Sequence, residues 1–92
     1  MLSFSEKREY LLTVLFRAKT LSSPEKIVAL ALAFKINSYG VSDIRIREIS
    51  ELASLDPRTV RRVIESLKEK IELQVRPEGR KNTYYFIQWG LL

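Results

Sequence analysis

The stretch that decides the fold is IREISELASLDPRTVRRVIESLKEK, residues 46–70. In its second half the apolar residues recur at helical spacing, which predicts a helix over residues 57–70 with one buried face, formed by Val60, Val63, Ile64 and Leu67. The Asp-Pro pair at residues 56–57 is typical of a helix start, because aspartate can cap free amides and proline fits the first helical position. A shorter helix over residues 47–53 comes before it. The stretch therefore predicts two helices joined by a tight turn at residues 54–55.

Two further helices are expected before this stretch. The first opens at Ser3, since Ser3 and Glu6 have the spacing of a capping box, and it extends to about Ala18. The second begins with Ser23 as its cap, and its apolar residues lie nearly all round the helix, so we expect it to be central and buried. It ends before Gly40, a residue suited to the left-handed conformation that commonly stops a helix.

Strand patterns lie on both sides of the decisive stretch. Residues 44–46 alternate in polarity and predict a clipped strand, and residues 71–76 and 83–89 predict two longer ones. The polar residues 77–82 would form the hairpin loop between them. Together with the helices, this pattern predicts an α+β fold that is mainly α. No linker divides the chain, so residues 1–92 would form a single domain.

The order of these elements and the residues of the turn resemble the winged helix-turn-helix superfamily. The resemblance rests on an apolar and a small residue side by side at Ile49 and Ser50, a turn residue at Ser54, and a capped helix with a basic opening after it. It implies a three-helix core plus a C-terminal β-hairpin wing over residues 21–92, with residues 3–19 as an extra N-terminal helix. Ser54 would take a left-handed conformation at a cost of about 1 kcal/mol, and the Ser50 hydroxyl would need a partner.

Within that superfamily the chain is similar to small prokaryotic, archaeal viral and plasmid regulators, and residues 21–32 look like the first helix of domains in replication proteins. The resemblance implies sequence-specific binding of double-stranded DNA by a transcriptional regulator. Residues 57–70 would then be the recognition helix in the major groove. The alternatives are a plasmid or viral replication-initiation protein, and a winged-helix adaptor that joins proteins.

The chain lacks the residues of many common active sites. Its 92 residues include no Cys and no His, which excludes disulfides, thiolate metal sites, a Ser-His-Asp triad and most zinc sites. Five glutamates could provide pairs of carboxylates for acid–base or metal chemistry, but chance alone would place such pairs on so charged a surface. They are Glu48, Glu51, Glu65, Glu69 and Glu72. We therefore expect no enzyme, no catalytic residues, no metal site and no cofactor.

The charge of the chain favours an anionic partner. Sixteen Lys and Arg stand against eleven Asp and Glu, for a net charge of +5. The segment from Arg58 to Lys81 has eight basic and four acidic residues, so most of the excess lies on the last helix and the hairpin. No apolar run is long enough to span a bilayer, and the first ten residues lack the order of a signal peptide. We expect a cytoplasmic, nucleoid-associated protein without a membrane partner.

The first group of candidate DNA-binding residues opens the last helix: Arg58, Thr59, Arg61 and Arg62. Cations near a helix N-terminus oppose the helix dipole, and Arg58 and Arg62 are like charges four residues apart. A helix selected only for solubility would reverse this order. The opening instead suits a helix that enters the major groove, where arginines meet guanine edges and phosphates. An ordinary solvated surface is the alternative.

The second group flanks the hairpin tip: Arg76, Arg80, Lys81 and Asn82. We expect Arg80 and Lys81 at backbone phosphates or in an adjacent minor groove, and not at base edges in the major groove. An ordinary polar loop is the alternative.

Two sets of apolar residues remain. Aromatic residues of the last strand can stack on single-stranded bases but are more often packed in a core: Tyr84, Tyr85, Phe86 and Trp89. The first helix carries more apolar surface than one core face can bury. We expect a homodimer held mainly by this helix and bound to an inverted repeat. The alternative is a helix wedged between the second helix and the sheet.

Overall fold

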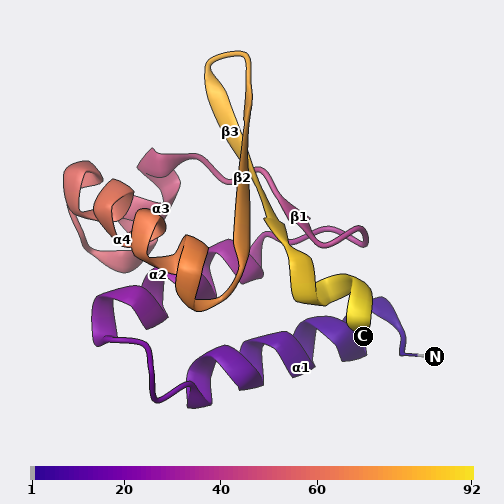
Figure 1. The fold of residues 1–92 in the computed structure, drawn as a ribbon. Coiled ribbons are helices and arrows are strands. Elements are labelled where there is room, and N and C mark those ends of the chain that lie inside the picture. Colours follow the sequence, from indigo (N-terminus) through magenta and orange to yellow (C-terminus); the bar gives the residue numbers. More distant parts are fainter. Residues whose placement is uncertain (1) are drawn as a thin grey trace.

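The computed structural model describes residues 2–92 and shows an α+β fold that is mainly helical (Figure 1). The described residues form four α-helices: α1 (Phe4–Arg17), α2 (Ser23–Phe34), α3 (Ile46–Ala53) and α4 (Pro57–Lys70). A three-stranded antiparallel sheet has the order β1-β3-β2, with β1 at Val41–Ser42, β2 at Leu73–Glu78 and β3 at Lys81–Phe86. A short 3₁₀ helix, η1 (Ile87–Leu91), follows β3.

Capping boxes start the first two helices. The Ser3 hydroxyl accepts a bond from the Glu6 amide, and the Glu6 carboxylate accepts one from the Ser3 amide, as predicted. The cap of α2 was expected at Ser23, but the structure places it at Ser22. The reason is that Ser22 stands three residues before Glu25, the spacing at which each side chain reaches the other's amide.

The segment between α2 and α3 differs from the prediction in two ways. Gly40 is left-handed, with φ of 79°, but it follows a turn at Asn37 and does not cap α2, which ends at Phe34. The strand expected at residues 44–46 is wrong. The short strand lies earlier, at β1, because backbone pairing with Tyr84 and Tyr85 of β3 selects residues 41–42.

The turn between α3 and α4 is as predicted. Ser54 is left-handed, with φ of 55°, and the Ser50 hydroxyl donates to the carbonyl of Leu55. Asp56 caps α4 by accepting a bond of 2.9 Å from the amide of Thr59. Local residue choice therefore accounts for the turn and for the start of α4.

The hairpin is longer and its turn tighter than expected. The strands pair as far as Glu78 and Lys81, so Gly79 and Arg80 alone form the turn. The predicted loop over residues 77–82 is wrong because Pro77, which lacks an N–H, lies on β2, an edge strand where proline is tolerated. Left-handed Glu72 separates α4 from β2, so this strand starts at residue 73. The strand predicted to end at residue 89 is β3, and it ends earlier, at Phe86, because the chain turns into η1.

The core is built around α2, which contacts α1, α3 and α4. The largest fully buried hydrophobic side chains of the core come from α2, α3, α4 and β3: Val28, Leu32, Ile49, Val60, Leu67 and Tyr84. The hairpin projects away from the helices, and α1 lies at the opposite end of the molecule from the hairpin tip (Figure 1). The hairpin tip and the arginine-bearing side of the first turns of α4 therefore remain exposed.

Three of the aromatic residues near the C-terminus are core residues. Tyr84, Phe86 and Trp89 are buried, which supports the packing interpretation and leaves them no face on which a base could stack. The Trp89 indole donates to the Ser38 carbonyl at 3.1 Å. Tyr85 is half-buried on the other face of the hairpin.

Candidate functional site

The first turns of α4 hold the first group of candidate residues. Arg58, Arg61 and Arg62 are exposed. Thr59 is half-buried, and its hydroxyl donates to the Asp56 carboxylate at 3.0 Å, in addition to the amide bond that caps the helix. These two bonds from Thr59, the amide bond first, lower the pKa of Asp56 below its usual value. Thr59 thus holds the start of α4 in place while the arginines extend from it.

The three arginines face different surroundings. Arg61 lines two clefts on the hairpin side of α4. Arg62 lines one of these clefts and also a third, between α4 and the start of α2. Arg58 lines none of them. The structure therefore divides a cluster that is continuous in the sequence.

One of these clefts is strongly cationic and has a volume of about 320 Å³. We call it the α3–hairpin cleft, since it lies between the start of α3, the hairpin and α4. Its charged lining residues are all basic: Arg45, Arg47, Arg61, Arg80 and Lys81. Ile44, Ile46, Asn82 and Tyr84 complete the lining. Four predicted site residues, Arg61, Arg80, Lys81 and Asn82, meet here.

Sequence reasoning missed Arg45 and Arg47. They lie more than ten residues before the predicted clusters, in the run Ile44-Arg45-Ile46-Arg47. The signal that could have found them is the alternation of this run, in which isoleucines turn inward and arginines outward. Ile44 is indeed buried and both arginines are exposed.

Acidic neighbours reduce the charge of the cleft only slightly. Arg47 lies 3.7 Å from the Glu51 carboxylate, and Lys81 lies 3.9 Å from that of Asp43. Both pairs are exposed to solvent, where ion pairs are weak and screened by salt. Since the other three lining cations have no acidic partner among residues 2–92, the cleft keeps a net positive charge.

A second cleft, of about 480 Å³, lies between the hairpin and the middle of α4. Val75 and Pro77 of the hairpin and Ile64 of α4 give it an apolar floor. Its charges are mixed, because Lys68 pairs with Glu65 at 2.9 Å. This cleft therefore lacks the single sign of charge that distinguishes its neighbour.

Arg76 is the one hairpin candidate that the structure separates from the others. It pairs across the hairpin with Thr83, on the face opposite Asn82. Its guanidinium lies 4.8 Å from the centre of the Tyr85 ring, and it also bonds to Gln74 at 3.4 Å. Arg76 thus faces away from the α3–hairpin cleft.

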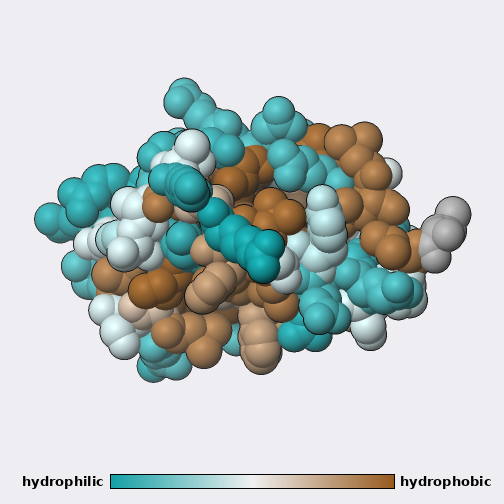
Figure 2. Space-filling model, turned by 90° about the horizontal axis from the view of Figure 1, so that it is seen from below, coloured by the Kyte–Doolittle hydropathy of each residue, from teal (hydrophilic) through white to brown (hydrophobic). Residues whose placement is uncertain are grey.

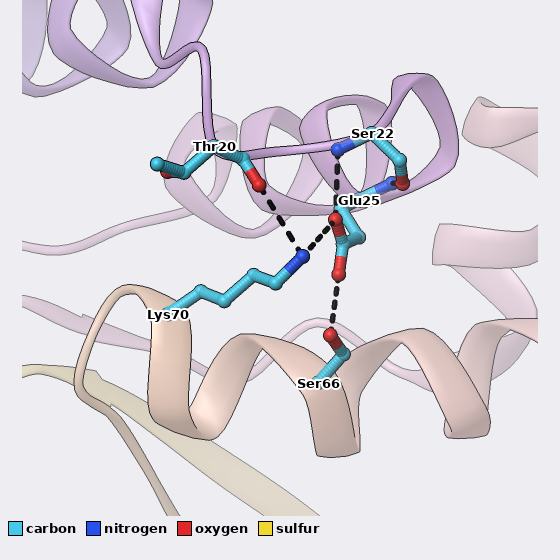
Figure 3. A network of polar contacts seen from close by, with 5 residues as sticks. All are labelled: Thr20, Ser22, Glu25, Ser66 and Lys70. Atoms are coloured by element: carbon cyan, nitrogen blue, oxygen red, sulfur yellow. Dashed lines mark hydrogen bonds and ion pairs between the residues drawn. The ribbon is translucent and has the colours of Figure 1, made fainter.

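A buried carboxylate on α2 holds the back of α4 (Figure 3). Glu25 accepts bonds from the Ser22 amide at 2.7 Å, from the Lys70 ammonium at 2.9 Å and from the Ser66 hydroxyl. Lys70 also donates to the carbonyl of Thr20 at 3.2 Å. These contacts, that of Ser22 most strongly, lower the pKa of Glu25 from 4.5 to about 2.

Sequence reasoning missed this network because Ser66 and Lys70 lie more than 40 residues after Glu25. The carboxylate is ionised at neutral pH and ties the last turns of α4 to the start of α2. It thereby helps to set the direction in which the arginines at the other end of α4 point.

Residues 2–92 contain no cluster of three metal-ligating His, Cys, Asp or Glu side chains. No helix within the same residues is long and apolar enough to cross a membrane.

Comparison of the chain with protein-family models, with curated proteins and with solved structures finds no match. The function must therefore be inferred from the residues of the site.

Proposed function

We propose that this chain is a winged helix-turn-helix protein that binds double-stranded DNA in a sequence-specific way and acts as a transcriptional regulator. Helices α2, α3 and α4 would be the three-helix core, and the β2–β3 hairpin would be the wing. The observation that carries the proposal is the meeting of cations from three separate segments beside the exposed start of α4. A basic surface of this kind is the electrostatic footprint of a nucleic-acid partner.

Base reading is assigned to Arg58 and Arg62. Both are exposed, and neither forms an ion pair within residues 2–92. Their charges oppose the dipole of α4, so they weaken the helix in the free protein. Guanine edges and phosphates in the major groove would compensate both arginines, which gives this arrangement a physical reason.

The test begins with selection of bound sites from random duplex DNA. Replacement of Arg58 or Arg62 by Ala should weaken binding to the selected site by about 1–3 kcal/mol each and relax preference at one base pair. Lys35→Ala is a matched control, because Lys35 is exposed at the end of α2 and its replacement changes the net charge equally. If both arginine variants bind the selected site like the wild type at fixed salt, α4 is not the recognition helix.

The alternatives are outcomes of the same measurements. A replication-initiation protein would show the same chemistry, and its selected sites would map to an origin and not to promoters. A protein adaptor would show no salt-dependent affinity for duplex DNA. Either result would replace the transcriptional assignment.

We also propose a homodimer, through a surface that α1 shares with α2 and α3. The sequence-based prediction has the dimer held mainly by α1, and we extend this surface because an apolar groove between α1 and α2 and another between α2 and α3 meet at Leu30. Exposed apolar side chains line each groove. Phe16 lines the one between α1 and α2, and the groove between α2 and α3 is lined by Ile27, Phe34 and Leu52. Figure 2, which views the molecule from the α1 side, shows such hydrophobic areas between hydrophilic side chains.

The area is consistent with an interface between two copies. An aromatic side chain offers about 200 Å², and Phe16 and Phe34 are 66% and 53% exposed. With the aliphatic neighbours, each copy would cover on the order of 500 Å². A pair with its polar rim then approaches the roughly 1,200 Å² at which specific interfaces begin.

Sedimentation equilibrium at micromolar concentration tests the dimer, which should have twice the 10.7 kDa mass of the chain. Phe34→Glu should give a monomer, because it places a charge at the centre of the interface. Tyr39→Glu is the matched control, since Tyr39 is 83% exposed and lines neither groove. A monomeric mass for the wild type would refute the dimer and leave DNA binding untouched.

A further inference from the structure

The α3–hairpin cleft has a composition that an ordinary surface lacks. Five cations line it, and the acidic residues nearest to it are exposed and only loosely paired with them. Like charges gathered in one cleft repel each other, and Arg45, Arg61 and Arg80 form no ion pair within residues 2–92. Repulsion between these cations destabilises the empty cleft, and a bound anion would relieve it, so the cleft favours an anionic ligand.

The position of the cleft beside α4 indicates which anion would bind there. An α-helix with its side chains is about 10–12 Å across, and the major groove of B-DNA is about 12 Å wide. A helix lying in that groove therefore has the sugar-phosphate backbone directly against its flanks. On one flank of α4 lies the α3–hairpin cleft, which Arg61 also lines, and this cleft would face that backbone.

We infer that the α3–hairpin cleft binds one or two phosphates of the DNA backbone. Arg45, Arg47 and Arg61 would act there together with the hairpin cations. This inference rests on the proposed function and divides the arginines of α4: Arg61 holds the backbone, whereas Arg58 reads bases.

The lining fits a phosphodiester. Guanidinium groups offer paired donors that match the oxygens of a phosphate, and the Asn82 amide adds a further donor. Ile44 and Tyr84 are buried beneath the cleft and give its lining a fixed base. The volume of about 320 Å³ is small among ligand sites and suits a phosphate with its sugar.

The salt dependence of duplex binding tests the inference. The double variant Arg45→Ala/Arg47→Ala should flatten the slope of log K against log salt by about 1 for each phosphate that the cleft no longer binds. The ranking of duplex sequences should stay as in the wild type. The pair Lys19→Ala/Lys35→Ala removes the same charge at exposed positions outside the cleft and should leave the slope unchanged.

A backbone probe makes the test local. In a series of selected duplexes, a single uncharged methylphosphonate replaces one phosphate at a time. The affinity of the wild type should fall several-fold at the one or two positions that contact the cleft. The Arg45→Ala/Arg47→Ala variant should be insensitive at those positions, while Arg45→Lys/Arg47→Lys keeps most of the effect because it keeps the charge.

The outcomes separate the inference from the proposed function. Three results would each refute the phosphate site and leave DNA binding standing. The first is a salt slope of Arg45→Ala/Arg47→Ala equal to that of the Lys19→Ala/Lys35→Ala control. The others are a changed ranking of duplex sequences, and equal methylphosphonate sensitivity in the wild type and in Arg45→Ala/Arg47→Ala. A wild type without salt-dependent affinity for any duplex would refute both. Far-UV circular dichroism confirms that each variant is folded.

Discussion

Replacement of Gly40 by Ala should be strongly destabilising, because two separate penalties meet at this residue. Its φ of 79° lies in the left-handed region, which an L side chain rarely adopts. A Cβ built there would lie 2.5 Å from Cγ and 2.6 Å from Cβ of Trp89. The Trp89 Cβ is set by the backbone of η1, and its ring is buried and bonded to Ser38. The indole therefore has no simple way to move aside.

The two penalties can be estimated separately. The left-handed conformation costs an alanine about 1–2 kcal/mol, and overpacking of a tight contact costs about 1–3 kcal/mol. Gly40→Ala should therefore lower the free energy of unfolding by about 2–5 kcal/mol. Gly79→Ala provides the matched control: φ is 64°, and no atom lies within 4 Å of the added Cβ. Only the backbone penalty of about 1–2 kcal/mol applies there.

Urea unfolding measures both variants. Trp89 is the only tryptophan, so its fluorescence reports the contact directly, and far-UV circular dichroism reports the helices. Gly40→Ala should also shift the fluorescence of the folded protein, whereas Gly79→Ala should not. Equal decreases in stability for the two variants, with an unchanged spectrum of the folded state, would show that Gly40 does not meet Trp89 as described.

Three other changes have defined outcomes. The pKa of Glu25 is lowered from 4.5 to about 2 in the folded chain, so its ionised form stabilises the fold above pH 4.5, and this stability is lost as the pH falls towards 2. Urea unfolding at a series of pH values across that window should show the free energy of unfolding declining steeply for the wild type and less steeply for Glu25→Gln. Ser54→Gly should raise the melting temperature, since it removes a left-handed penalty of about 1 kcal/mol. Leu32→Ala should lower the free energy of unfolding by about 2–5 kcal/mol in the same urea assay, because Leu32 is fully buried in the central helix.

Helix starts and the turn between α3 and α4 were predictable because their causes are local. The capping box at Ser3, the cap at Asp56 and the left-handed Ser54 each depend on side chains within a few residues of the backbone they serve. Where two serines competed, at Ser22 and Ser23, local spacing alone was decisive and sequence reasoning chose the wrong one. Caps are thus readable to within about one residue.

Strand limits were less predictable because the partner strand decides them. β1 has only two residues, and its place depends on pairing with β3, which lies more than 40 residues later. The hairpin turn shrank to Gly79 and Arg80 for the same reason: cross-strand pairing continued through residues that look like a polar loop. Alternating polarity indicates a strand but does not say where its hydrogen bonds end.

The sequence by itself determined the four helices, the hairpin and the basic character of α4 and the hairpin, since periodicity, caps and charge are properties of neighbouring residues. Only the tertiary structure decided which cations share a cleft. Arg45 and Arg47 come from the start of α3 and meet Arg61 and Arg80 because the turn before α4 and the antiparallel hairpin fold both segments to one side. Glu25 likewise acquires its role only when α2 packs against α4. Contacts between distant segments follow from the packing of the whole core, and no local pattern in the chain encodes them.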